Sequence, residues 1–185
     1  FAPAVNQGLA ALPERDVVLL NNDLVVTPGW LTRMRSALRE DPRRGIVGPL
    51  CNAAAAPQQV NMPPYGEDLE RMVTLSIHLA SQWKGRGFEA PRISGFCMLI
   101  GAGVIDRIGG LDERFVPGFF EDDDYGLRAR LAGFRLWVAA DVFVHHYGSR
   151  TFRNVVRDPR SSLQENWRRF KEKWGVAPDL ELGSF

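Results

Sequence analysis

The sequence has few cysteines, almost no net charge and no long apolar run. Its two cysteines, Cys51 and Cys97, are too few for a disulfide framework or a cysteine-rich zinc site, and they favour a reducing, cytosolic setting. A net charge of +1 gives no field that would attract nucleic acid. No apolar run approaches the ~18 residues of a membrane helix, and the first residues lack the pattern of a signal peptide.

What is present suits one α/β domain. The chain has 185 residues, of which 45% are hydrophobic and 24% charged, which is enough apolar material for a core. Apolar runs alternate with amphipathic segments, and this strand–helix–strand order predicts a layered fold with a mostly parallel sheet flanked by helices. We expect strands at 16–20, 46–50, 93–100, 134–138 and 142–146, and helices at 28–41, 67–83, 102–108, 121–133 and 161–174.

Two further expectations concern the first helix and the long loop. Thr27 precedes a proline and is expected to cap the helix that follows, with Leu31, Met34 and Leu38 on its buried face. Residues 51–66 are rich in Ala, Pro, Gln and Asn without a clear period, so they are expected to form a surface loop.

The triplet Asn21-Asn22-Asp23 follows the first predicted strand. In open α/β sheets, ligands bind beyond the carboxyl ends of strands, and a carboxylate there can hold a hard cation that neutralises a diphosphate. The alternative is an ordinary turn, because Asn and Asp favour turns for backbone reasons.

Four consecutive acids, Glu121 to Asp124, open a predicted helix. They can complement the helix dipole, and Asp124 can pair with Arg128 one turn later. Four adjacent acids repel one another, however, so a carboxylate that acts as a general base is an equally good interpretation. His145 and His146 end a strand, and imidazole is a common metal ligand. Their side chains point to opposite faces, so at most one can face a given metal.

These signals occur in an order that resembles family 2 glycosyltransferases of the GT-A type. Residues 20–30 (LNNDLVVTPGW) resemble the family's metal-binding segment. Residues 108–115 (IGGLDERF) and 120–128 (FEDDDYGLR) resemble its acceptor loop and its acidic segment. Residues 144–151 (VHHYGSRT) resemble its terminal metal-histidine segment, and residues 6–8 (NQG) match a short motif that precedes the metal-binding strand.

The resemblance implies a GT-A fold of the Rossmann-like layered kind and a bound Mn²⁺ or Mg²⁺. Asp23 matches the main metal-binding carboxylate, and His146 matches the metal histidine better than His145. Asn21 stands where many members have an acid; its amide oxygen is a weaker ligand, so a lower metal affinity is expected. Arg150 follows in the next loop, where a cation could hold the diphosphate.

The same resemblance implies an inverting transfer from a nucleotide-diphosphate sugar to a hydroxyl. Asp122 matches the catalytic base, and Glu121 and Asp124 are expected to orient that base or to bind the acceptor. Phe120 is a candidate for stacking on the acceptor, with packing of the loop as the alternative. Residues 148–152 (GSRTF) are similar to a segment of members associated with rhamnosyl transfer.

The sequence departs from the family's pattern before residue 6, where nothing resembles the usual nucleotide-binding half of about 70–100 residues. The expectation is that residues 1–160 form only the metal-binding and acceptor-side half of the domain. Such a partial domain would bind its donor poorly on its own and would leave a sheet edge on which a second copy could pair. The rival interpretations are a binding module for carbohydrate or nucleotide that has lost the chemistry, and a metal-dependent hydrolase of phosphate esters.

Residues 161–185 are expected to form a basic amphipathic helix and a tail. Leu163, Trp167, Phe170 and Trp174 recur at helical spacing, which favours a cap packed on the domain. The alternative is a helix that lies on a membrane surface near a lipid-linked acceptor. We therefore expect a cytoplasmic enzyme that acts on a glycan or lipid-linked acceptor in the assembly of polysaccharide, and that is compatible with a peripheral position at the inner face of a membrane.

Overall fold

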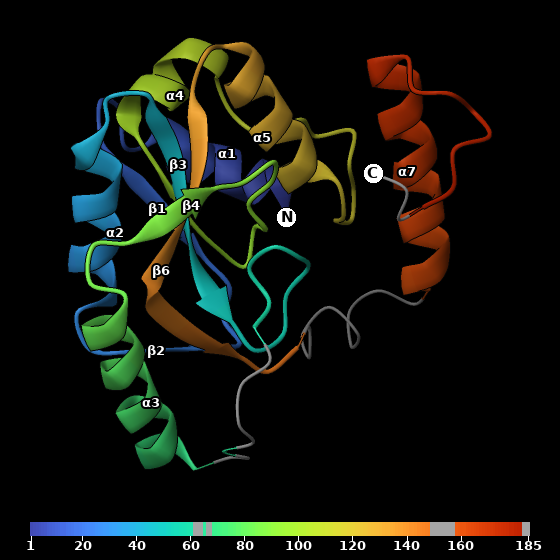
Figure 1. Ribbon diagram of the computed structural model, residues 1–185. Coiled ribbons are helices and arrows are strands. Elements are labelled where there is room, and N and C mark those ends of the chain that lie inside the picture. Colours follow the sequence, from blue (N-terminus) through green and yellow to red (C-terminus); the bar gives the residue numbers. More distant parts are fainter. Residues whose placement is uncertain (61–64, 66–67, 149–157, 183–185) are drawn as a thin grey trace.

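The computed structural model describes residues 1–60, 65, 68–148 and 158–182. Helices flank a central sheet, and α7 stands beside α5 at one side of the molecule (Figure 1). The elements are α1 (Ala2–Ala10), β1 (Val17–Leu20), β2 (Leu24–Val26), α2 (Trp30–Glu40), β3 (Arg44–Cys51), α3 (Leu69–Gln82), β4 (Gly87–Glu89), β5 (Cys97–Ile100), α4 (Ala102–Ile108), α5 (Glu121–Leu131), β6 (Arg135–His146) and α7 (Pro159–Trp174).

The sheet is mixed, so the expectation of a mostly parallel sheet is wrong. The strand order is β1-β5-β3-β6-β2, and β4 also pairs with β6. β3 and β6 are parallel, whereas the other pairings between described strands are antiparallel. β1 and β3 do run in the same direction, as a strand–helix–strand unit requires, but β5 lies between them and antiparallel to both.

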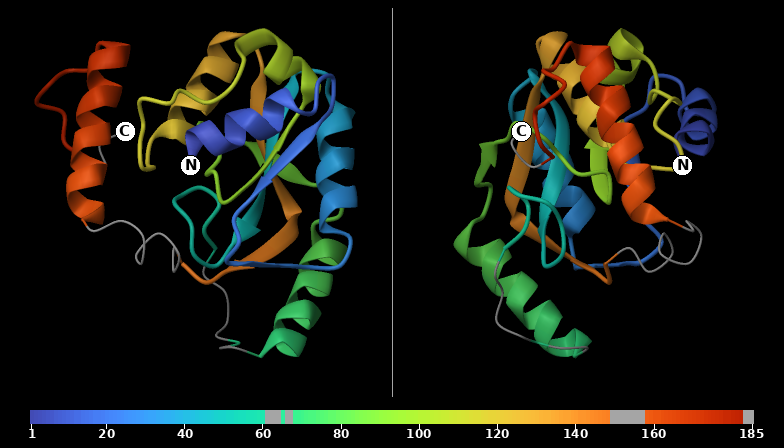
Figure 2. Two further views of the ribbon diagram at one scale, coloured as in Figure 1. Left: turned by 180° about the vertical axis from the view of Figure 1, so that it is seen from behind. Right: turned by 90° about the vertical axis from the view of Figure 1, so that its right-hand side faces the viewer.

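Two cores lie on the two faces of the sheet. Because side chains alternate along a strand, Met98 and Ile100 of β5 face the cluster that includes residues of α1, α4 and α5. Cys97 and Leu99 face the cluster with α2. Figure 2 shows α1 and α2 on opposite sides of the sheet. All four β5 side chains are buried, which explains their continuous apolar run.

Two predicted strands have other bounds. The strand expected at 93–100 begins only at Cys97, because the preceding backbone N–H groups of Ser94 and Gly95 bond to side chains instead of to a neighbouring strand. The two strands expected at 134–138 and 142–146 are one strand, β6, with a register irregularity opposite Pro49 and Leu50.

Helix α2 begins at Trp30 with Gly29 at the N-cap, in a left-handed conformation (φ 73°), so Thr27 is not the cap. The Thr27 hydroxyl instead donates a 2.7 Å hydrogen bond to the carbonyl oxygen of Phe143 in β6. Met34 and Leu38 are buried as expected, whereas Leu31 is exposed. Helix α1 and the short strands β2 and β4 were not predicted.

Helix α7 packs on the domain through the predicted face. Trp167 and Phe170 are buried in a cluster with Phe115 and Phe120, and Leu163 and Trp174 pack against its edge, as predicted. The outward charge of this helix is largely paired within the helix, since Arg168 contacts both Glu165 and Glu172. Within the described residues, no helix combines the length and the apolar character needed to cross a bilayer.

Candidate active site

The sheet brings the predicted metal residues to one place. Asp23 lies in the turn between β1 and β2, and the pairing of β2 with β6 sets Leu24 opposite His146. As a result, Asp23 Oδ1 lies 3.2 Å from His146 Nε2, and both side chains are at least nine-tenths buried. The carboxylate and the imidazole come from segments more than 120 residues apart in the sequence, so the fold itself assembles this pair.

The surroundings of His146 fix its ring. Its Nδ1 lies 2.7 Å from the carbonyl oxygen of Ala53, which can only accept, so Nδ1 carries the proton. The Asn52 side chain bonds both the N–H and the C=O of His146, and the Phe96 ring stacks on the imidazole with centroids 5.5 Å apart. This arrangement holds the imidazole as metal-ligating histidines are held, with one nitrogen on a carbonyl and the other turned to the site.

The Nε2 atom of His146 is buried and has no hydrogen-bond partner among the described residues, although Asp23 is close. In the neutral ring this atom is a lone pair that faces a carboxylate oxygen, an acceptor against an acceptor. A cation between or beside the two groups would resolve the conflict, so the pair fits a divalent metal. Within the described ranges, however, no three His, Cys, Asp or Glu side chains cluster closely enough to form a metal site.

The neighbours of this pair contribute differently. His145 points to the opposite face, where its Nδ1 lies 2.6 Å from the Tyr65 hydroxyl and its ring packs on Tyr147. Asn21 lies at the start of the turn, and its backbone N–H donates to the carbonyl oxygen of Phe96. Its predicted role as a weak metal ligand stays a prediction. Arg150, the predicted diphosphate ligand, lies outside the described residues.

The four acids that open α5 have separate surroundings. Glu121, Asp123 and Asp124 are 8%, 7% and 0% exposed, whereas Asp122 is partly exposed. No ion pair of Asp122 occurs within the described part of the chain. Its carboxylate sits at the N-terminus of α5, where the helix dipole stabilises negative charge. Asp122 is therefore the acid of the cluster that can meet a substrate.

A short loop before β5 holds the Asp122 carboxylate. Its Oδ2 accepts a 2.7 Å hydrogen bond from the Gly95 N–H. The preceding N–H, of Ser94, donates to the buried Gln58 side chain, which also donates to the Pro49 carbonyl oxygen. A Cβ on residue 95 would lie 3.3 Å from Asp122 Cβ, so glycine lets the backbone approach the acid this closely.

This loop also connects the two halves of the site. Gly95 bonds Asp122, and the next residue, Phe96, stacks on His146 and accepts a hydrogen bond from Asn21. Two consecutive residues thus contact all three motifs singled out in the sequence. The Gly95–Phe96 loop thus links the candidate base to the candidate metal pair.

The buried acids Glu121 and Asp123 are perturbed by that burial. Burial first, and then the charge of Asp122, raise the pKa of Glu121 to about 8, and its Oε2 has no partner among the described residues. Burial and Asp122 also raise the pKa of Asp123, to about 7, although Arg92 opposes this shift with two contacts at 2.9 and 3.0 Å. Glu121 therefore holds its proton at neutral pH.

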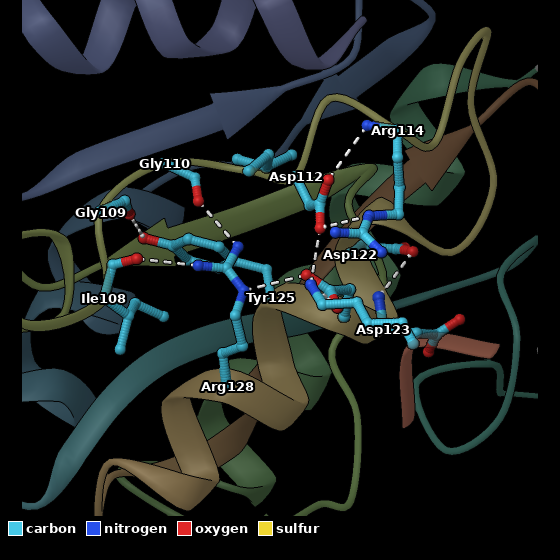
Figure 3. Close-up of polar contacts among 12 residues, drawn as sticks. Ile108, Gly109, Gly110, Asp112, Arg114, Asp122, Asp123, Tyr125 and Arg128 are labelled. Carbon is cyan, nitrogen blue, oxygen red and sulfur yellow. Dashed lines mark hydrogen bonds and ion pairs between the residues drawn. The ribbon is translucent and has the colours of Figure 1, made fainter. Parts of the chain in front are cut away.

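Asp124 is the centre of a structural network rather than an open acceptor ligand. Its Oδ2 accepts from Arg128 Nε at 2.9 Å, as the spacing predicts, and its Oδ1 accepts from Trp174 Nε1 at 3.0 Å and lies 2.5 Å from Lys173 Nζ. Lys173 also bonds Asp112 at 2.7 Å. Burial opposes ionisation of Asp112, but the hydrogen bonds from Lys173 and Arg114 outweigh it and lower its pKa to about 2. Figure 3 shows part of this network.

The loop at 109–115 is fixed from two sides. Arg128 donates to the carbonyl oxygens of Ile108 and Gly110, and the Tyr125 hydroxyl donates to that of Gly109 (Figure 3). From the other side, the Asn6 side chain of α1 bonds both the N–H and the C=O of Leu111. The acceptor-loop motif and the short motif at residues 6–8 are thus parts of one packed unit.

Phe120 packs within the domain, and its predicted role in stacking on the acceptor stays a prediction. It is buried, and its ring stacks on Trp167 with centroids 5.3 Å apart. Phe119 and Phe120 both have left-handed backbones, with φ of 73° and 70°, which is uncommon for aromatic residues. The acids of α5 follow directly from this strained pair.

Sequence reasoning missed several residues that hold the site. Gln58 lies in a segment that gave no periodic signal, and Asn52 and Arg92 are polar residues in predicted loops. Asn166 was not recognised because its helix was interpreted from its apolar positions alone. Gly95, by contrast, carried a signal, since it interrupts an apolar run.

Comparisons with known proteins give the family of the chain. The chain is 26% identical over 223 aligned positions to the "N-acetylglucosaminyl-diphospho-decaprenol L-rhamnosyltransferase" of Mycobacterium tuberculosis, in strains CDC 1551 and H37Rv; the alignment covers 100% of this chain and 71% of the relative. It is 23% identical over 189 positions to "Uncharacterized protein y4gI" of Sinorhizobium fredii, covering 92% of this chain and 20% of that protein. A model of the family described as "Glycosyltransferase like family 2" matches residues 2–161. The chain therefore belongs to glycosyltransferase family 2.

Proposed function

We propose that this chain carries the catalytic centre of an inverting, metal-dependent glycosyltransferase that moves a sugar from a nucleotide-diphosphate donor to a hydroxyl. One observation carries the proposal. Asp122 is the accessible member of the acid cluster, and the Gly95–Phe96 loop joins it to the Asp23–His146 pair. A base for the acceptor and a pair that fits a cation for the leaving group are then present in one site.

Asp122 would act as the general base. As the acceptor oxygen attacks the anomeric carbon, its proton passes to the Asp122 carboxylate. The bond between the anomeric carbon and the donor oxygen breaks, and its electron pair leaves with the nucleoside diphosphate. Attack opposite to the leaving group inverts the configuration at that carbon. Hydrogen bonding to Gly95 fixes the direction of the carboxylate before the acceptor arrives.

Asp23 and His146 would hold a Mn²⁺ or Mg²⁺ ion, with Asn21 and Arg150 as further contacts to the metal and the diphosphate. The ion, when bound, supplies positive charge that stabilises the leaving diphosphate. His146 contributes the Nε2 lone pair that its contact with Ala53 leaves facing Asp23.

The name of one relative supports a proposal for the substrate class. Its name describes rhamnosyl transfer to an N-acetylglucosaminyl-diphospho-decaprenol. On that basis we propose a deoxyhexose or hexose donor and an acceptor sugar carried on a lipid diphosphate, in the assembly of a cell-surface polysaccharide. The site would then work at the cytoplasmic face of a membrane.

The test is sugar transfer by the purified full-length gene product and its Asp122→Asn variant. We expect Asp122→Asn to lower kcat by about 100-fold or more, because general-base catalysis contributes 10²–10⁴-fold. Nucleotide binding, measured by calorimetry, should remain. Asp106→Asn, an exposed acid on α4, is the matched control and should leave transfer unchanged.

Three results would contradict the proposal. Transfer at the wild-type rate by Asp122→Asn would remove Asp122 as the base. Nucleotide binding without transfer in the wild-type protein, across UDP-, dTDP- and GDP-sugars, would favour a binding module. Release of sugar or phosphate into water without any acceptor would favour a hydrolase.

A further inference from the structure

Helix α7 lies almost wholly beyond the residues that the family model matches, yet it contacts both flanks of Asp122. On one flank, the Asn166 side chain donates to the carbonyl oxygens of Gly118 at 2.6 Å, of Phe119 at 3.3 Å and of Val116 at 3.4 Å. On the other flank, Lys173 contacts Asp124, which is two residues after the candidate base.

Asn166 is 0% exposed and is placed to bond this loop. One amide group meets three carbonyl oxygens in the segment that leads into α5. Its Oδ1 accepts from Arg169 Nη1 at 3.1 Å, which fixes the amide orientation and aims its N–H groups at the loop. Buried polar side chains are normally hydrogen-bonded, and here all three acceptors of the Asn166 amide N–H groups lie in one segment.

The segment needs such support. Phe119 and Phe120 are both left-handed, and a residue with a side chain keeps that backbone only where its surroundings enforce it. Asn166 bonds the carbonyl of Phe119, and Trp167 and Phe170 pack on the Phe120 ring. Without these contacts, the chain before Glu121 would relax toward ordinary φ values. The start of α5 would then turn, and its acids with it.

From these contacts we infer that α7 positions the candidate base, and that Asn166 is a positioning residue for Asp122. This inference rests on the proposed function. Asn166 touches no candidate ligand group; it acts through the loop at 116–120. Lys173 holds the C-terminal side of Asp122 in place, because it bridges Asp124 to Asp112 of the acceptor-loop motif. The metal pair lies outside these contacts, so donor binding should not depend on them.

The test compares Asn166→Leu with wild type in the full-length gene product. Leucine has nearly the shape of asparagine but donates no hydrogen bond. We expect kcat to fall about 10- to 100-fold, since small misplacements of a catalytic group have effects of this size. The KM for the donor should stay unchanged. Hydrogen–deuterium exchange should rise in peptides spanning 116–124. Arg168→Ala, on the outer face of the same helix, should change none of these quantities.

Lys173→Met provides a second variant if Asn166→Leu does not fold, and Lys173→Arg should restore most of its lost kcat. Unchanged exchange at 116–124, or a kcat equal to wild type despite faster exchange, would overturn the inference and leave the proposed function intact. A rise in donor KM as large as the fall in kcat would also overturn it, because it would indicate general loosening. If the wild-type protein transfers no sugar, the proposed function fails, and the exchange measurement alone decides whether Asn166 holds the segment.

Discussion

At the scale of single residues, the acid cluster shows how position along one helix separates four similar side chains. Asp123 pairs with Arg92, Asp124 with Arg128 and Lys173, whereas Glu121 is buried and forms no ion pair among the described residues. Their surroundings raise the pKa values of Glu121 and Asp123, and leave Asp122 as the partly exposed acid of the four. Function at this site depends on burial as much as on residue type.

Glu121 gives a prediction about pH. Its pKa is raised by burial from an ordinary 4.5 to about 8, so the folded state binds a proton that the unfolded state has released. That contribution to stability is complete below about pH 4.5 and is lost as the pH rises through 8. We expect the wild-type melting temperature to fall between pH 6 and 9 by about 5–10 °C more than that of Glu121→Gln.

Differential scanning calorimetry across this pH range measures the effect. Glu70→Gln is the control, because Glu70 is exposed at the start of α3 and should follow the wild-type curve. Parallel curves for wild type and Glu121→Gln would show that the Glu121 carboxyl is ionised in the fold and would contradict the prediction.

At the scale of elements, the contact between α1 and the loop at 109–115 shows why a motif far from the chemistry matters. The Asn6 amide bonds Leu111 in both directions, as a neighbouring strand would. A Cβ on Gly110 would lie 2.2 Å from Asn6 Oδ1, so residue 110 must be glycine for the contact to form. Helix α1 therefore sets the position of the loop from which Asp112 reaches Lys173.

Gly110→Ala should break this contact. The added methyl group would displace Asn6, and we expect a loss of about 1–3 kcal/mol in the free energy of unfolding, as for overpacked sites. Urea denaturation measures it. Gly103→Ala, inside α4 with a nearest atom 4.0 Å from the built Cβ, should be neutral or stabilising by up to about 1 kcal/mol. Equal midpoints for the two variants would contradict this account.

The elements also show what the sequence could and could not predict. Residues such as Met34 and Leu38, or Trp167 and Phe170, recur at helical spacing, and their helices and buried faces were predicted correctly. The directions of the strands were not predicted correctly. β5 is far from β1 and β3 in the sequence, and no local sequence pattern indicates that it pairs between them. The loop before β5 was predicted as part of a strand, because the sequence does not show that its N–H groups bond side chains distant in the sequence.

At the scale of the whole molecule, the site lies where distant segments meet. Asp23 comes from the first sixth of the chain and His146 from its last quarter, and the β2–β6 pairing joins them. The metal ligands, the base and their roles remain predictions. A ligand that bridges these segments would bind the folded chain and not the unfolded one, so binding should stabilise the entire domain.

Thermal shift of the full-length gene product measures this linkage. With Mn²⁺ and UDP, dTDP or GDP at about 100 times the dissociation constant, we expect one nucleotide to add about 2.7 kcal/mol, or about 5–10 °C. His146→Ala should abolish the manganese-dependent part of the shift, whereas His78→Ala, on the exposed side of α3, should keep it. A nucleotide shift that survives chelation with EDTA would overturn the metal prediction and retain the donor site.

The order of acids on α5 has a consequence for the length of the loop before it. Successive residues of an α-helix are turned by about 100°. One residue added between Gly118 and Glu121 would rotate the acids relative to Gly95 and Arg92, and would set a different carboxylate at the substrate position. Insertions and deletions in this loop should therefore disturb the site more than substitutions of its exposed side chains. Homologous sequences should keep its length.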